Sequence, residues 1–163
     1  QVMGAAIGAF IRRWRSDAGN PLMLSALPGI SREDVDTRER SLWRYRAALP
    51  LAIDSRASMG EGCTPLVEKS WGGLSPLFKL EWFNPTSSFK DRGASVMVSF
   101  LKQLGIDHIL EDSSGNGGAA IAAAGAAAGV KVKILAPSYT PLPQVAQIRA
   151  FGAEVQLVEC PRK

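Results

Sequence analysis

The fold is decided by residues 109–135, which read ILEDSSGNGGAAIAAAGAAAGVKVKIL. The stretch opens with a short apolar run at Ile109 and Leu110 and closes with another from Val132 to Leu135, and both runs are typical of strands. Between them, residues 119–128 are almost entirely alanine and glycine, which indicates a helix with very small side chains. Two strands joined through a helix by short loops predict a parallel βαβ unit.

The same alternation continues on both sides of this unit. Upstream, residues 76–82 alternate apolar and polar side chains as a half-buried strand does, and a turn at residues 84–88 leads into a helix that ends near Gly105. Downstream, residues 143–151 predict a helix. We therefore expect an α/β fold with helices on both faces of one parallel sheet, in three αβα layers, and with strands near residues 76–82, 109–111, 131–135 and 155–158.

Apolar side chains at helical spacing predict two further packing faces. In the helix that follows residue 88, this face is expected to hold Met97, Phe100, Leu101 and Leu104. Residues 1–50 mix apolar positions at helical spacing with arginines, so we expect a mostly helical N-terminal segment. Its packing face would hold Leu42, Trp43, Tyr45 and Leu49.

Composition excludes several classes of protein. The chain has 163 residues, of which 46% are hydrophobic and 21% charged, as in a globular domain. Most of the surplus behind its net charge of +4 lies in arginines near the start of the chain, at positions 12, 13, 15, 38, 40, 44 and 46. We interpret these arginines as solvated helix faces and not as a nucleic-acid site. The cysteines Cys63 and Cys160 and the histidine His108 lack metal-ligand spacing, so we expect no metal site. The apolar residues 1–11 are too short to span a bilayer, and we expect a cytoplasmic protein without a membrane segment.

The first loop that carries chemistry spans residues 84–93, NPTSSFKDRG. It places Lys90 in the first turn of a helix, where the macrodipole disfavours a positive charge. A lysine in this position, when also partly desolvated, loses its proton more easily and becomes an amine nucleophile that can form a Schiff base. For an isolated lysine after a capping serine, a solvated surface position is the simpler interpretation, and only the whole string favours the reactive one.

The second loop, SSGNGG at residues 113–118, precedes the alanine-rich helix. Backbone N–H groups at a helix start, together with hydroxyl and amide side chains, suit a carboxylate or a phosphate. On composition alone, a buried packing helix after a glycine-rich turn is the simpler interpretation. A generic nucleotide loop is disfavoured because the chain contains neither Gly-x-Gly-x-x-Gly nor a Walker-type Gly-Lys-Ser/Thr.

Taken together, these motifs resemble a known family. Residues 84–93 closely resemble the Schiff-base lysine motif of fold type II pyridoxal-phosphate enzymes, the tryptophan synthase β-like group, and residues 113–118 resemble the partner loop of the same group. Residues 42–45 (LWRY) and 60–66 (GEGCTPL) resemble threonine synthases in particular. The resemblance covers roughly residues 38–163.

The resemblance implies a role for each matched position. Lys90 would carry pyridoxal 5'-phosphate and later move protons at the α-carbon of the substrate, and Asn116 would bond to the ring hydroxyl of the cofactor. Phe89 would shape the cofactor pocket beside the lysine. Ser88, on the substrate side, would also shape the pocket beside the lysine, and the amino-acid carboxylate would be held by Ser114, Gly115 and Gly117.

The implied activity is that of a pyridoxal-phosphate-dependent lyase or β/γ-replacement enzyme on a small amino acid, similar to threonine synthase, which makes threonine and phosphate from O-phosphohomoserine. One alternative is an elimination enzyme similar to serine/threonine dehydratase or diaminopropionate ammonia-lyase. Another is a non-catalytic module, which the presence of Lys90 disfavours. Many relatives have threonine or histidine where this chain has Gly117, so a side-chain contact to substrate is expected to be missing.

The resemblance also implies a domain organisation. Residues 1–75 would belong to a larger domain, and residues 76–163 would form the small domain that contacts the cofactor. The phosphate-gripping glycine loop of the family lies beyond the position of Lys163, so the chain is expected to be an N-terminal fragment whose partner is the missing C-terminal part. The full-length enzyme is expected to be a homodimer, and the isolated fragment is expected to bind the cofactor poorly and to be inactive.

Overall fold

A computed structural model of the chain describes residues 15–23, 26, 28–49 and 51–159. Arg12, Arg13, Cys160 and the apolar run at residues 1–11 lie outside this part. In chain order the elements are η1 (Leu42–Ala48), β1 (Leu66–Glu68), β2 (Leu77–Lys79), η2 (Glu81–Phe83), α1 (Lys90–Gln103), β3 (His108–Asp112), α2 (Asn116–Ala128), β4 (Lys131–Pro137), α3 (Leu142–Ala150) and β5 (Glu154–Val158), where η denotes a 3-10 helix.

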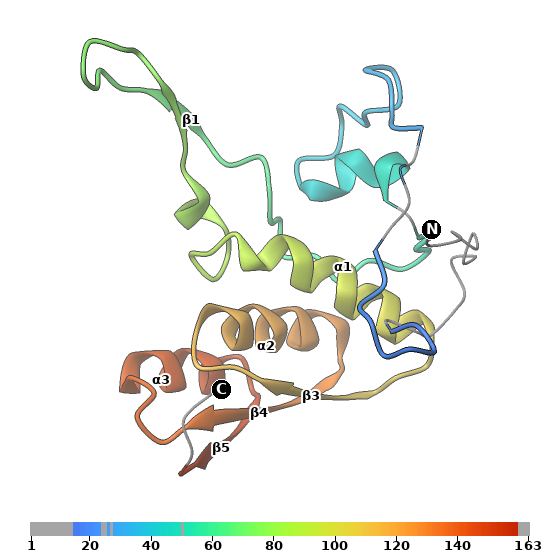
Figure 1. Cartoon of the computed structure of the whole chain (residues 1–163), viewed down its shortest axis with the longest axis vertical. Coiled ribbons are helices and arrows are strands. Elements are labelled where there is room, and N and C mark those ends of the chain that lie inside the picture. Colours follow the sequence, from blue (N-terminus) through green and yellow to red (C-terminus); the bar gives the residue numbers. More distant parts are fainter. Residues whose placement is uncertain (1–14, 24–25, 27, 50, 160–163) are drawn as a thin grey trace.

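The α/β class predicted from the sequence is confirmed. Strands β3, β4 and β5 form a parallel sheet in that order, with Ile109 opposite Val132 and Ile134 opposite Val155. Helices α2 and α3 both lie on one face of this sheet, and α1 packs on α2 one layer further out (Figure 1). In the described residues the helical layers therefore cover one face of the sheet, and not both faces in three αβα layers as predicted. None of the described helices combines the length and the apolar character needed to cross a bilayer.

The strand predicted at residues 76–82 forms, but it does not join the parallel sheet. It is β2, and it pairs antiparallel with β1 in a separate hairpin that projects away from the rest of the chain (Figure 1). The reason is local: Gly72 and Gly73 have φ angles of 57° and 79°, and two adjacent positive-φ residues make the tight turn that hairpins favour. The predicted domain boundary at residue 75 falls inside this hairpin, and the division into residues 1–75 and 76–163 stays a prediction.

The prediction of a mostly helical N-terminal segment is wrong for the described residues. From residue 15 to residue 49, the only helix in the described part is η1, which Ser41 caps by accepting a 3.2 Å hydrogen bond from the Trp43 N–H. Gly19 and Gly29 have positive φ angles, and each has a proline close by in the sequence, so this region turns repeatedly. Leu42 and Trp43 are buried as expected, whereas Tyr45 is exposed.

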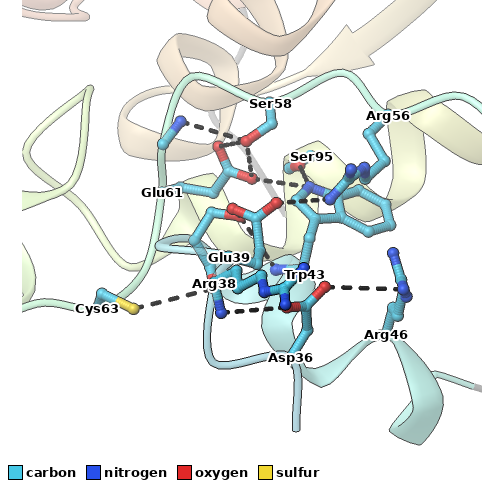
Figure 2. Close-up of polar contacts among 12 residues, drawn as sticks. Asp36, Arg38, Glu39, Trp43, Arg46, Arg56, Ser58, Glu61, Cys63 and Ser95 are labelled. Atoms are coloured by element: carbon cyan, nitrogen blue, oxygen red, sulfur yellow. Dashed lines mark hydrogen bonds and ion pairs between the residues drawn. The ribbon is translucent and has the colours of Figure 1, made fainter.

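The two segments that resemble threonine synthases, residues 42–45 and 60–66, lie against each other and against α1. Trp43 is 1% exposed, and its Nε1–H lies 3.1 Å from Glu61 Oε1 and 3.0 Å from Ser95 Oγ of α1 (Figure 2). The Leu42 N–H donates to the Glu61 carbonyl at 2.7 Å. The buried polar groups are thus hydrogen-bonded, which fixes η1 on the helix that begins at Lys90.

The buried face of α1 differs from the predicted one. Of the predicted residues, Met97 is 40% exposed and the others are half-buried, with Leu101 packed against the core. The buried residues of α1 are Asp91, Ala94, Ser95, Val98 and Ser99. The side chains on this face are small because they pack against the alanines of α2 in one buried cluster, where the two helices approach each other closely. The serines are not left unpaired, since Ser95 Oγ donates to the Ala57 carbonyl at 2.8 Å and Ser99 Oγ accepts from the Ala57 N–H at 2.8 Å.

Replacing Ser99 with alanine should therefore destabilise the protein by about 1–3 kcal/mol, because the buried N–H of Ala57 loses its acceptor. Urea denaturation measures the change. The matched control is Ser55→Ala, which changes an exposed serine two residues before Ala57 and should alter stability by no more than about 0.5 kcal/mol. If the two substitutions changed the free energy of unfolding equally, the hydrogen bond between Ala57 and Ser99 would not be a specific source of stability.

Candidate active site

The first turns of α1 and α2 meet at an open pocket beside the carboxyl end of β3. Its volume is about 430 Å³, and it is lined by Lys90, Gly93, Ala94, Glu111, Ser113, Ser114, Gly115, Asn116, Gly117 and Ile121. The structure thus brings together Lys90 and the four predicted residues of the second loop, Ser114 to Gly117. The two loops share one pocket as predicted, but only the second follows a strand of the parallel sheet, because the strand before the Lys90 loop belongs to the separate hairpin.

The other two predicted site residues, Ser88 and Phe89, support Lys90 from outside the pocket lining. Ser88 is buried, and its Oγ accepts a 3.2 Å hydrogen bond from the backbone N–H of Lys90. Phe89 is 57% exposed, and the Nζ of Lys90 lies 4.9 Å from the centre of its ring. Lys90 itself is exposed in the described part of the chain, so the condition of partial desolvation is not met there.

Polar bonds hold the Lys90 loop in place from three directions. The buried carboxylate of Asp91 accepts from the Thr86 N–H at 2.7 Å and from the Thr86 hydroxyl, which closes the loop onto the helix start. Asn84 Oδ1 accepts from the Gly62 N–H at 2.9 Å. From α3, Gln147 Nε2 donates to the Thr86 carbonyl at 3.3 Å. These bonds fix the position of the backbone from which the Lys90 side chain extends.

The second loop is shaped by Ser113. Its buried Oγ accepts from the Gly118 N–H at 2.7 Å and from the Gly115 N–H at 3.4 Å. The first-turn N–H groups of Asn116 and Gly117 have no partner within the helix, because a helix leaves its first N–H groups without a carbonyl. Such groups bind anions. A side chain at Gly117 would bring its Cβ within 3.1 Å of Ser113 Oγ, so glycine preserves this arrangement.

The alanine-rich helix α2 has a packing role. Residues 118–125 of α2 are buried under α1 and against the sheet, and only the start of the helix and Ile121 reach the pocket. The simpler interpretation of its composition is therefore correct for the helix, while the loop before it lies in the pocket. Sequence reasoning missed Glu111, which lines the pocket from β3; its position near the carboxyl end of a predicted strand was the available signal.

The residues present fit an aldehyde cofactor together with a carboxylate substrate. The pocket combines a primary amine, the amide of Asn116 and first-turn N–H groups. These can bond to a carbonyl carbon, a ring hydroxyl and an oxyanion respectively.

A charged pair joins the two elements that flank the lysine loop, Glu81 of η2 and Arg92 of α1. Glu81 accepts from Arg92 Nε at 2.8 Å and from Arg92 Nη2 at 2.9 Å.

These bonds from Arg92, aided by those from Thr64 and Asn84, lower the pKa of Glu81 to about 2. The unfolded carboxyl has a pKa near 4.5, so between these two values the unfolded chain binds more protons than the folded one. The stability that Glu81 contributes should therefore be complete above this window and should be lost as the pH falls through it.

The difference in urea midpoint between the wild type and Glu81→Gln should then shrink on acidification from about pH 6 to about pH 3. Glu68→Gln, which changes an exposed hairpin carboxylate, is the control and should show a small difference throughout. A difference for Glu81→Gln that does not change with pH would contradict the lowered pKa.

The chain is similar to known proteins over much of its length. The family described as "Pyridoxal-phosphate dependent enzyme" matches residues 57–162. The chain is 38% identical to the threonine synthase of Methanocaldococcus jannaschii over 133 residues, covering 77% of this chain and 33% of the relative. It is 34% identical over 113 residues to a human serine dehydratase-like protein, covering 66% of this chain and 34% of that one.

Among solved structures, the cysteine synthase of Entamoeba histolytica is similar with a TM-score of 0.55 and 38% sequence identity. The match covers 60% of this chain and 32% of that structure. The chain therefore spans about a third of the length of the relatives that it matches. Since the family match covers most of the chain, including both loops of the pocket, this chain belongs to the family of pyridoxal-phosphate dependent enzymes.

Proposed function

We propose that the pocket at Lys90 holds pyridoxal phosphate and a small amino-acid substrate, and that Lys90 is the residue to which the cofactor attaches. Pyridoxal phosphate is the cofactor of the family. The observation that carries the proposal is that Lys90 and residues 114–117 line one pocket although they come from different helices.

Each residue of the pocket would have a defined task. When bound, pyridoxal phosphate supplies an electron sink for the α-carbon of an amino acid. The Nζ of Lys90 would take and return the proton at that carbon, since it reaches the pocket from the first turn of α1. Asn116 would orient the ring through its hydroxyl. The first-turn N–H groups of Asn116 and Gly117, with Gly115 and the Ser114 hydroxyl beside them, would bind the substrate carboxylate. Ser88 and Phe89 would flank the lysine.

We propose threonine synthase as the specific activity, with O-phosphohomoserine as substrate and threonine and phosphate as products. Supporting this choice, residues 42–45 and 60–66, the two segments that resemble threonine synthases, form one packed unit on α1. Gly117 favours a second candidate, an elimination enzyme of the serine/threonine dehydratase type, because it offers no side chain to a larger substrate.

The decisive experiment incubates the purified full-length protein with pyridoxal phosphate and one substrate at a time. Release of both threonine and phosphate from O-phosphohomoserine would support threonine synthase. Release of ammonia and a 2-oxo acid from serine or threonine, with no threonine synthesis, would support the dehydratase. Failure to bind pyridoxal phosphate at Lys90 would refute both.

We also propose that the full-length enzyme is a homodimer and that the 163-residue polypeptide is inactive by itself. Inactivity is expected because Lys90 is exposed in an open pocket, and a wet, loosely organised site weakens orientation and electrostatic contacts. Measurable turnover by the 163-residue polypeptide would contradict this.

A further inference from the structure

A second pocket lies on the other side of the first turn of α1. Arg92 lines it, and Arg92 follows Lys90 by two residues, which places the two side chains on nearly opposite sides of the helix. The volume is about 750 Å³, in the range of small-molecule sites. Its cationic lining residues are Arg38, Arg40, Arg44, Lys79 and Arg92. We call it the basic pocket.

The negative charges near the basic pocket are already engaged. Glu39, the one carboxylate in its lining, accepts from Arg56 at 2.6 Å and from Ser41 Oγ at 2.8 Å, and Figure 2 shows it directed toward Arg56. Glu81 does not line the pocket and is held by Arg92. Asp36, a third carboxylate close by, lies 3.7 Å from Arg46 Nη2 and accepts from the backbone N–H of Arg38 at 3.1 Å. The five cations of the lining still outnumber the three carboxylates near them.

Several donors of the basic pocket remain available. Arg38 and Arg40 are exposed, and in the described part of the chain no carboxylate lies within bonding distance of their guanidinium groups. Arg44 Nη1 donates only to the thiol Sγ of Cys63 at 3.4 Å, a weak acceptor, and its Nε is buried without a hydrogen-bond partner. A buried donor without an acceptor costs free energy, which a bound anion would recover.

We propose that the basic pocket binds a phosphate group, either inorganic phosphate or a small phosphate monoester, at a site separate from the Lys90 pocket. Guanidinium groups match phosphate because their planar forks donate two parallel hydrogen bonds to its oxygens. Binding would bring together Arg38, Arg40 and Arg44, whose like charges otherwise repel one another. The proposal does not depend on the reaction catalysed at Lys90.

The first test is a titration of the full-length protein, loaded with pyridoxal phosphate, with inorganic phosphate or glycerol phosphate at constant ionic strength. Calorimetry should show that Arg38→Gln/Arg40→Gln weakens binding by about tenfold or more. The matched control is Arg32→Gln/Arg149→Gln, which removes the same charge from exposed positions outside the pocket and should bind as the wild type does. Whichever ligand binds more tightly identifies the source of the phosphate group.

The second test reports on the pocket itself. Cys63 is exposed and lines the basic pocket, so its alkylation by iodoacetamide can be followed by peptide mass spectrometry. Saturating phosphate should slow the reaction in the wild type and in the charge control, and not in Arg38→Gln/Arg40→Gln. The proposal is overturned if phosphate leaves the Cys63 rate unchanged in the wild type, or if the pocket variant binds phosphate as tightly as the control. Thermal melting confirms that each variant is folded.

Discussion

Replacing Lys90 with alanine should abolish covalent attachment of pyridoxal phosphate and lower the activity of the full-length enzyme by about 10²–10⁴-fold or more. The physical reason is that no other amine lines the pocket in the described residues, so the substitution removes both the attachment point and the group that moves the α-proton. The loss should be in turnover, because the residues proposed to hold the carboxylate stay in place.

The measurement is borohydride reduction followed by peptide mapping, together with the visible absorption band of the bound cofactor. Lys69→Ala removes an exposed lysine from the β1–β2 hairpin and is the control. It should keep both the labelled Lys90 peptide and the activity. If Lys90→Ala retained a reducible cofactor attachment at another lysine together with full turnover, the assignment of Lys90 would be wrong.

The regular part of the fold could be predicted from the sequence because its signals are local. Residues 109–135 contain a complete βαβ unit, and the helix and strands formed within a few residues of their predicted bounds. The partner of β2 was predicted wrongly because an alternating strand does not indicate which strand it pairs with. The information was present in Gly72-Gly73, a hairpin turn between β1 and β2.

The buried face of α1 shows a different limit. The 3.6-residue pattern of Met97, Phe100, Leu101 and Leu104 predicts a packing face on the assumption that large apolar side chains go inside. Here the neighbouring helix is made of alanine, so close contact selects small residues, and two serines are buried by bonds to Ala57. Those bonds join residues about 40 positions apart, which periodicity alone does not reveal.

The candidate site was predictable where it follows from backbone geometry. Lys90 and Asn116 each begin a helix, and the structure places both in one pocket, although only the Asn116 helix follows a strand of the parallel sheet. The surroundings of the amine were not predictable in the same way. Its desolvation depends on tertiary contacts, and in the described residues Lys90 is exposed.

The GEGCTPL segment leads to the second large effect. Gly62 has a φ of 108°, and a Cβ at this position would lie 2.6 Å from the Leu42 backbone nitrogen and 3.0 Å from the Ser41 carbonyl carbon. Gly62→Ala should therefore cost about 2–6 kcal/mol, since backbone strain and a clash with another backbone each cost about 1–3 kcal/mol. The Gly62 N–H also holds Asn84 at the start of the Lys90 loop, so cofactor binding should weaken as well.

Gly60→Ala is a control that separates the two causes. Gly60 lies two residues away with a φ of 86°, but a Cβ there would have no atom within 4 Å, so only the strain of about 1–2 kcal/mol is expected. Urea denaturation of both variants gives the free energies of unfolding, and pyridoxal phosphate titration gives the effect on the site. Because the clash is with the backbone of Leu42, whose N–H is bonded to Glu61, it cannot be relieved by rotating a side chain. Equal losses of stability in the two variants would show that backbone conformation alone, and not the close approach of η1, requires glycine at position 62.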